Sequence, residues 1–144
     1  MPKGKVTLLD RAKGDLLAAK SLLTLADGDD VVMDICAYHL QQCAEKVAKY
    51  MILLQGDLYT NDHRSNMYLE DLNDNEVKEI IEGISGNIDS WATTIRYSSS
   101  ILSSKKAIIE VLAKCEKLIE LATIKTPSPI PSPSKCVSNK PKKQ

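Results

Sequence analysis

Phenylalanine is absent from this 144-residue sequence and tryptophan occurs once, so the interior must be built from other side chains. Aromatic residues make up 4% of the chain, whereas hydrophobic residues as a whole make up 43%. A core of Leu, Ile, Val, Ala and Met suits closely packed helices better than it suits a β-sandwich. No segment alternates between apolar and polar residues for long enough to indicate a strand. These absences favour an all-α fold.

Cysteine and histidine are too few and too scattered to form a familiar metal site. The four cysteines include no Cys-x-x-Cys pair, and the sequence has only two histidines. The sequence also lacks a Gly-rich phosphate loop, a Gly-x-Ser-x-Gly motif and an HExxH motif. We therefore expect no metal, no cofactor and no hydrolase of familiar design, and we expect the cysteines to be small core residues.

Long apolar runs are missing as well. No uninterrupted apolar stretch approaches the length of a membrane span, and charged residues interrupt the N-terminal segment throughout, unlike a signal peptide. These features predict a cytoplasmic protein that does not cross a membrane.

The net charge of zero conceals an uneven distribution along the chain. The 19 residues 126–144 hold four lysines, no acidic residue and five of the six prolines. The remaining 125 residues therefore carry 15 basic and 19 acidic residues, a net charge of −4. Such an acidic body disfavours binding to RNA, which depends on neutralising phosphates. We expect residues 1–125 to form one helical domain and residues 126–144 to be a disordered Pro/Ser/Lys-rich tail.

Apolar residues recur at spacings of three and four in four segments, which predicts four main helices. The first follows a capping Thr7, the second spans about residues 30–55, the third begins at Asn75, and Ser103 or Ser104 caps the last. Residues 66–72 are expected to form a further short helical segment. The expected fold is an up-and-down bundle of four main helices plus a short helix.

The second helix carries a polar patch opposite its apolar stripe. Gln42, Glu45, Lys46 and Lys49 are neighbours on one helix face, with Gln41 beside them. In one interpretation this face is solvated, and a Glu45–Lys49 pair adds only a few tenths of a kcal/mol. In the other it lines a cleft, where the lysines attract phosphate and the Gln and Glu side chains hydrogen-bond a sugar or a base.

Three other positions offer polar groups that could take part in binding or catalysis. His39 lies in the apolar half of the second helix, where a hydrogen-bonded packing role is favoured over catalysis. His63 follows a loop and opens the short helix, where it could cap that helix or contact a ligand. Arg96 and Tyr97 close the third long helix, where the guanidinium could interact with the helix dipole or bind an anion.

Together these segments resemble the HEPN family (higher eukaryotes and prokaryotes nucleotide-binding). Residues 37–51, AYHLQQCAEKVAKYM, are similar to its aromatic-x-x-Gln-Gln-Ala-x-Glu-Lys-x-x-Lys signature. His63 stands where the family often has a histidine, and Arg96-Tyr97 stands where it commonly has Ala-Arg-Tyr. The resemblance covers about residues 7–122.

The resemblance implies a helical bundle that usually dimerises. Many members are encoded with a small nucleotidyltransferase and act in toxin–antitoxin pairs or as nucleotide-binding modules. Others are metal-independent ribonucleases with an Arg, four to six intervening residues and a His. After Arg96 that histidine would fall at residues 101–103, which are Ile, Leu and Ser, and the same spacing after Arg64 or Arg11 also meets no histidine.

We therefore expect a non-catalytic, homodimeric HEPN module that binds a nucleotide, partners a nucleotidyltransferase, or does both. The resemblance assigns its candidate ligand contacts by motif position: Gln42, Glu45, Lys46, Lys49, His63, Arg96 and Tyr97. Two alternatives remain. One is a ribonuclease toxin that uses Arg96 with His39 or His63, and the other is a pure protein-interaction scaffold.

Overall fold

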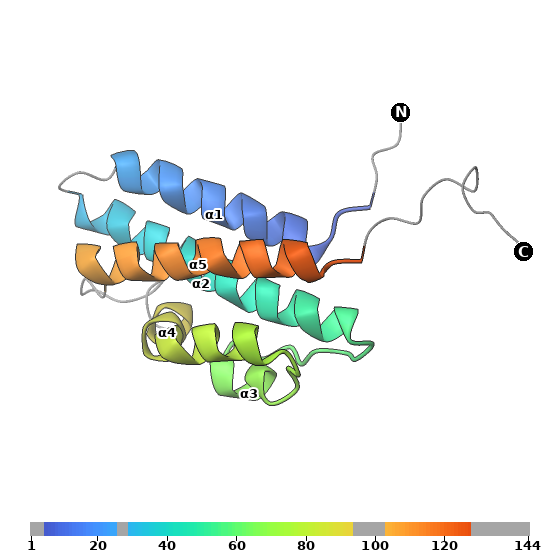
Figure 1. Ribbon diagram of the computed structural model, residues 1–144. Helices are drawn as coiled ribbons and strands as arrows, with labels where there is room; N and C mark the ends of the chain where they lie inside the picture. Colours follow the sequence, from blue (N-terminus) through green and yellow to red (C-terminus); the bar gives the residue numbers. More distant parts are fainter. Residues whose placement is uncertain (1–4, 26–28, 94–102, 128–144) are drawn as a thin grey trace, which may run out of the picture.

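Five helices make up the regular structure of the residues that the computed structural model describes, 5–25, 29–93 and 103–127. No strand occurs within these ranges. The helices are listed in chain order: α1 (Leu8–Leu25), α2 (Asp30–Leu54), α3 (Ser65–Leu69), α4 (Asn75–Thr93) and α5 (Lys105–Lys125). The predicted all-α bundle of four main helices and one short helix is confirmed (Figure 1).

The helix starts follow the capping chemistry that the sequence indicates. Thr7 and Asp10 form a reciprocal capping box at α1: the Thr7 N–H donates to Asp10 Oδ2 at 2.9 Å, and the Asp10 N–H donates to Thr7 Oγ1 at 3.1 Å. Asp29 caps α2 and Ser104 caps α5, each through its side-chain oxygen. The predicted caps at Thr7 and Ser104 are therefore confirmed.

The predicted helix ends are accurate to within a few residues. The C-cap of α2 is Gln55, and Gly56 directly after it has a φ of +93°, a left-handed conformation that suits glycine. The short helix, expected over residues 66–72, spans Ser65–Leu69. The last described helix ends at Lys125, close to the predicted domain boundary. Residues 128–144 lie outside the described part, so the disorder of the tail stays a prediction.

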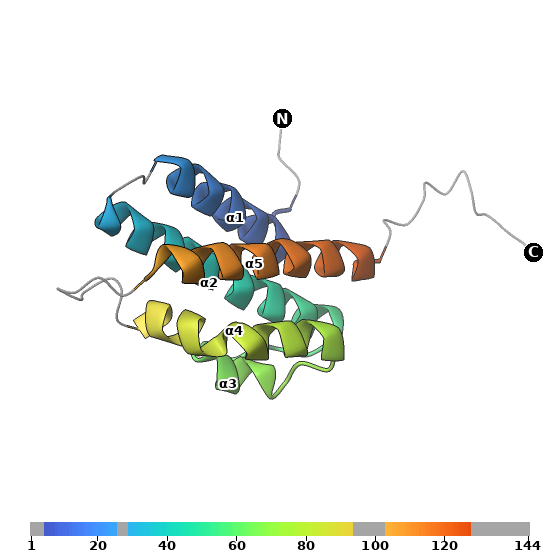
Figure 2. The same ribbon diagram turned by 60° about the vertical axis from the view of Figure 1, so that its left-hand side comes forward.

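α2 lies at the centre of the bundle and contacts each of the other four helices. The main helices alternate in direction, α1 and α4 running one way and α2 and α5 the other (Figures 1 and 2). α1 packs closely on α2 because Ala12 and Ala19 are fully buried between them, and the Cys36 thiol donates to the Ala19 carbonyl at 3.2 Å. Burial raises the pKa of the Cys36 thiol to about 11.

The core agrees with its phenylalanine-free composition. Its largest fully buried side chains include Trp91 of α4, Tyr68 of α3 and Leu40 of α2, surrounded by aliphatic residues. Cys36, Cys43 and Cys115 are free and buried, as expected for small core residues, and Cys136 lies outside the described part. No helix among the described residues combines the length and the apolar character needed to cross a membrane.

Candidate functional site

The polar face predicted on α2 lies largely inside the protein. Gln41, Glu45 and Lys49 are only 0%, 5% and 6% exposed. Of the two interpretations, a solvated face is therefore wrong for these three residues. Later segments of the chain bury these side chains: the loop after α2, which includes Tyr59 and His63, and the helix α3 pack over this side of α2.

The Glu45 carboxylate is the centre of this buried group. Gln41 Nε2 donates to Glu45 Oε1 at 2.7 Å, and Lys49 Nζ donates to Glu45 Oε2 at 2.9 Å. His63 Nδ1 lies 3.1 and 3.0 Å from the two carboxylate oxygens. The Glu45–Lys49 pair was expected at this spacing but as an exposed pair. With both side chains 7% exposed, each charge instead depends strongly on the other.

The Lys49 ammonium also lies over two aromatic rings. Its Nζ is 5.2 Å from the ring centroid of Tyr59 and 5.9 Å from that of Tyr68, within range of a cation–π interaction. Burial raises the pKa of the Tyr68 hydroxyl, and the nearby carboxylates of Glu45 and Asp89 raise it further. Tyr68 therefore stays neutral, and its buried hydroxyl has no hydrogen-bond partner among the described residues.

A second polar group forms where α1 meets α2. Lys46 Nζ donates to Asp15 Oδ2 at 2.5 Å, and His39 Nδ1 lies 2.9 Å from Asp15 Oδ1. Lys46 Nζ also lies 3.3 Å from Gln42 Oε1. Asp15 is not one of the candidate residues predicted from the sequence, in which it is simply an acidic residue next to Leu16 of the apolar stripe of α1.

The two groups join through Gln42, whose Nε2 donates to Gln41 Oε1 at 2.7 Å. We call the connected side chains the α2 network: Asp15, His39, Gln41, Gln42, Glu45, Lys46, Lys49 and His63. The network links α1, α2 and the loop that precedes α3 by hydrogen bonds between side chains.

Three nitrogen-bearing side chains of the α2 network lie nearer the surface than the carboxylates that they contact, whereas Lys49 and Gln41 are as buried as Glu45. The side chains of Asp15 and Glu45 are 13% and 7% exposed, whereas those of Lys46, His39 and His63 are 25%, 29% and 59% exposed. Both imidazoles interact with a carboxylate through Nδ1, so Nε2 is an acceptor in a neutral ring and a donor only in a protonated one. The partly exposed Lys46 ammonium can donate a hydrogen bond to an anion in either case.

The remaining candidate residues have different outcomes. His63 does not cap the short helix: α3 begins at Ser65 after Arg64, which makes no side-chain capping bond, and His63 bonds Glu45 instead. Arg96 and Tyr97 lie outside the described residues, between α4 and α5. In the described part of the chain, no group of three or more His, Cys, Asp or Glu side chains is placed to hold a metal ion.

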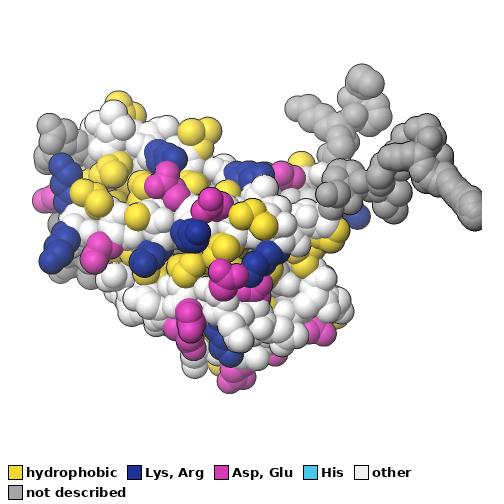
Figure 3. Space-filling view, in the orientation of Figure 1, with side chains coloured by type: hydrophobic (Ala, Val, Ile, Leu, Met, Phe, Trp, Pro, Cys, Tyr) yellow, Lys and Arg dark blue, Asp and Glu magenta, His cyan; other side chains and the backbone are white. Residues whose placement is uncertain are grey.

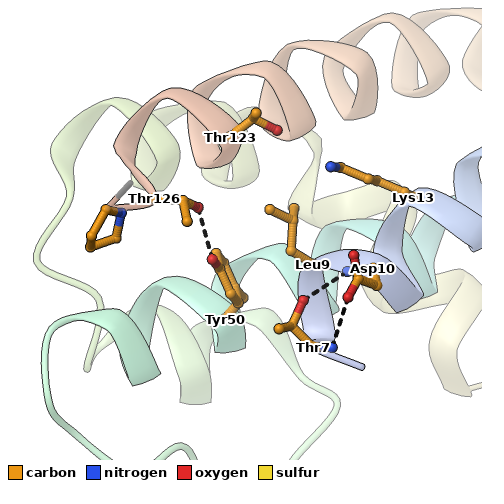
Figure 4. Close-up of a pocket in the computed structure, with 8 residues that line it drawn as sticks. Thr7, Leu9, Asp10, Lys13, Tyr50, Thr123 and Thr126 are labelled. Carbon is orange, nitrogen blue, oxygen red and sulfur yellow. Dashed lines mark hydrogen bonds between the residues drawn. The ribbon is translucent and has the colours of Figure 1, made fainter. Parts of the chain in front are cut away.

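A surface pocket of about 400 Å³ lies away from the α2 network, between the start of α1 and the end of α5 (Figure 4). The Tyr50 hydroxyl hydrogen-bonds Thr126 Oγ1 at 2.8 Å at its edge, and Lys13 and Asp10 line the α1 side. No network residue lines this pocket. The face formed by α1 and α5 carries interspersed acidic, basic and apolar side chains, and no histidine is visible on it (Figure 3).

No curated protein and no solved structure matches the chain significantly. The family model described as HEPN domain matches residues 6–125, which include all five helices and the whole α2 network. The chain therefore belongs to the HEPN domain family.

Proposed function

We propose that this protein is a non-catalytic, homodimeric HEPN module that binds a nucleotide through the α2 network and partners a nucleotidyltransferase in a toxin–antitoxin-like system. The observation that supports nucleotide binding is that Lys46, His39 and His63 are more exposed than the Asp15 and Glu45 carboxylates that they contact. The Lys46 ammonium is therefore a donor suited to phosphate oxygens, and each imidazole adds an Nε2–H donor when its ring is protonated.

The burial of the network divides its residues into two roles. Lys46 and Gln42 are partly exposed and His63 is more than half exposed, so in this proposal these three residues would contact the ligand. Glu45 and Lys49 are almost inaccessible, so in this proposal they position His63 and do not touch the nucleotide. Arg96 and Tyr97 keep the roles that the family resemblance implies, an anion contact and a stacking face.

The non-catalytic part of the proposal rests on the sequence. Family ribonucleases pair an arginine with a histidine four to six residues later, whereas residues 101–103 after Arg96 are Ile, Leu and Ser. A general acid or base at that position is therefore missing.

One contact favours a second candidate function, an atypical ribonuclease. His63 Nδ1 lies 3.0 Å from a Glu45 oxygen, an arrangement in which a carboxylate orients an imidazole for proton transfer through Nε2. Incubation of the purified protein with tRNA and mRNA tests this candidate. Cleavage that is lost in His63→Ala would support it, and intact RNA would exclude it.

Exposed apolar side chains support the homodimer. Leu25 at the end of α1 is 76% exposed, and Val31 and Ile35 in the first turns of α2 are 63% and 45% exposed. The two helix ends lie side by side (Figures 1 and 2), so these side chains lie at one end of the bundle. Burial of such residues at an interface would remove apolar surface from water.

Isothermal titration calorimetry tests the nucleotide half directly. We expect AMP, ATP or GTP to bind the wild type, adenosine to bind more weakly, and Lys46→Met to weaken nucleotide binding at least about tenfold. The matched control is Lys114→Met, which removes an exposed lysine from α5 and should leave the affinity unchanged. A wild type that binds none of these nucleotides would overturn the proposal, as would equal effects of the two variants.

Co-purification with an adjacently encoded nucleotidyltransferase tests the proposed partnership. Separate elution of the two proteins would refute that partnership.

A further inference from the structure

We infer that Asp15 is an internal competitor of the anionic ligand: its carboxylate occupies a position at Lys46 that a ligand phosphate would take. This inference rests on the proposed nucleotide site and concerns how its affinity is set. It assigns a role to a residue of α1 that lies outside the signature on α2.

The Asp15 carboxylate is held in place by the helix packing. Asp15 lies between Ala12, Leu16 and Ala19, which are 0–8% exposed and pack α1 against α2. One carboxylate oxygen accepts from Lys46 at 2.5 Å, and the other lies 2.9 Å from His39 Nδ1. Because α1 cannot withdraw without exposing this apolar seam, only the side chain of Asp15 can yield to a ligand.

The charges of the contact favour competition. Asp15 and Lys46 carry opposite charges in direct contact, so an approaching phosphate meets a cation that is already paired with a carboxylate. Lys46 also directs a second N–H towards Gln42 Oε1, which leaves one of its three N–H donors for a ligand. A ligand must therefore share Lys46 with Asp15 or displace the carboxylate.

An alternative role for Asp15 makes the opposite prediction. If the carboxylate mainly positioned Lys46 and His39, its removal would weaken ligand binding. Asp15→Asn separates the two roles, because the amide keeps the shape and one hydrogen-bond acceptor but removes the negative charge. Loss of a unit charge a few ångströms from a bound phosphate near the surface should tighten binding about five- to tenfold.

The experiment is calorimetric titration of the wild type, Asp15→Asn and Glu79→Gln with AMP and with inorganic pyrophosphate. Glu79→Gln is the matched control, since it removes one negative charge from the exposed surface of α4. We expect tighter binding in Asp15→Asn only, and no such gain when Asp15→Asn is added to Lys46→Met. Unchanged or weaker binding by folded Asp15→Asn, with a wild-type circular dichroism spectrum, would overturn the inference.

The outcomes separate this inference from the proposed function. Binding by the wild type that weakens in Asp15→Asn would leave the nucleotide site standing and refute competition. Binding seen only in Asp15→Asn would support competition and refute the nucleotide function of the wild type. Absence of binding in both proteins would refute both ideas. If Asp15→Asn does not fold, Lys46→Arg replaces it: a guanidinium can hold Asp15 and still offer donors to phosphate, so unchanged affinity there would count against competition.

Discussion

Removal of the Lys49 ammonium is expected to destabilise the protein more than removal of any exposed lysine. The side chains of Lys49 and Glu45 are each 7% exposed, and their Nζ–Oε2 distance is 2.9 Å. Deletion of one partner of a buried pair typically costs about 3–5 kcal/mol, because the other charge stays buried. Gln41 and His63 still hydrogen-bond Glu45 in Lys49→Met, which places the expected loss near the lower value, about 3 kcal/mol.

Urea unfolding followed by circular dichroism at pH 7 measures this loss. For a domain of this size, about 3 kcal/mol corresponds to a fall in Tm of roughly 12 °C. Lys114→Met serves as the exposed control and should leave the midpoint nearly unchanged. The double variant Glu45→Leu/Lys49→Met should recover part of the lost stability, since it leaves no uncompensated charge, although the buried Gln41 amide loses its acceptor. A loss below about 1 kcal/mol in Lys49→Met would show that the pair is not buried as described.

Three further results are expected. Tyr68→Phe should raise the free energy of unfolding by about 1 kcal/mol in urea titrations, because it removes a buried hydroxyl without a hydrogen-bond partner among the described residues. Destabilisation would mean that bound water or a ligand hydrogen-bonds this hydroxyl. Ile35→Glu should convert the dimer to a monomer in sedimentation analysis, and a wild type that is already monomeric would contradict the dimer proposal. The pKa of Asp74 is lowered: burial, which raises it, is outweighed by hydrogen bonds from Lys125 and the Val77 N–H. This contact therefore stabilises the protein above the ordinary Asp pKa, and the stabilisation is lost as the pH falls through the lowered pKa of Asp74. Asp74→Asn should flatten the acid limb of the plot of stability against pH. An unaltered acid limb would refute the role of Asp74.

The fold could be predicted because its signals are local. The apolar spacing in each segment indicates a helix, and short-range chemistry at Thr7 and Ser104 marks two helix starts that the structure confirms. The absence of a period-two pattern excludes long strands for the same reason. These properties need only the neighbouring three or four residues of the chain.

The site was only partly predictable because its contacts join distant segments. The spacing of Glu45 and Lys49 shows that they are neighbours on α2, but their burial depends on Tyr59, His63 and Tyr68, which follow α2. Helical periodicity cannot indicate which part of the chain will cover a polar face. The sequence did place Gln42 and Lys46 together correctly.

Asp15 illustrates the same limit most clearly. It lies 24 residues before His39 and 31 residues before Lys46, and their contact exists only because α1 folds back antiparallel along α2. A single acidic residue in an amphipathic helix has no local feature that distinguishes it from a solvated one.

The central place of α2 has a consequence for motion. α1 contacts neither α3 nor α4 among the described residues, so α2 and α5 connect the two sides of the bundle. Because every other helix packs on α2, and α1 packs on it most extensively, we expect the amides in the middle of α2 to exchange with solvent only when the whole domain unfolds. The α2 network joins α1 to α2 through the contacts of Asp15 with His39 and Lys46. A ligand that binds the α2 network would slow hydrogen exchange in both α1 and α2. Exchange rates of buried amides in these helices would therefore report whether the ligand is bound.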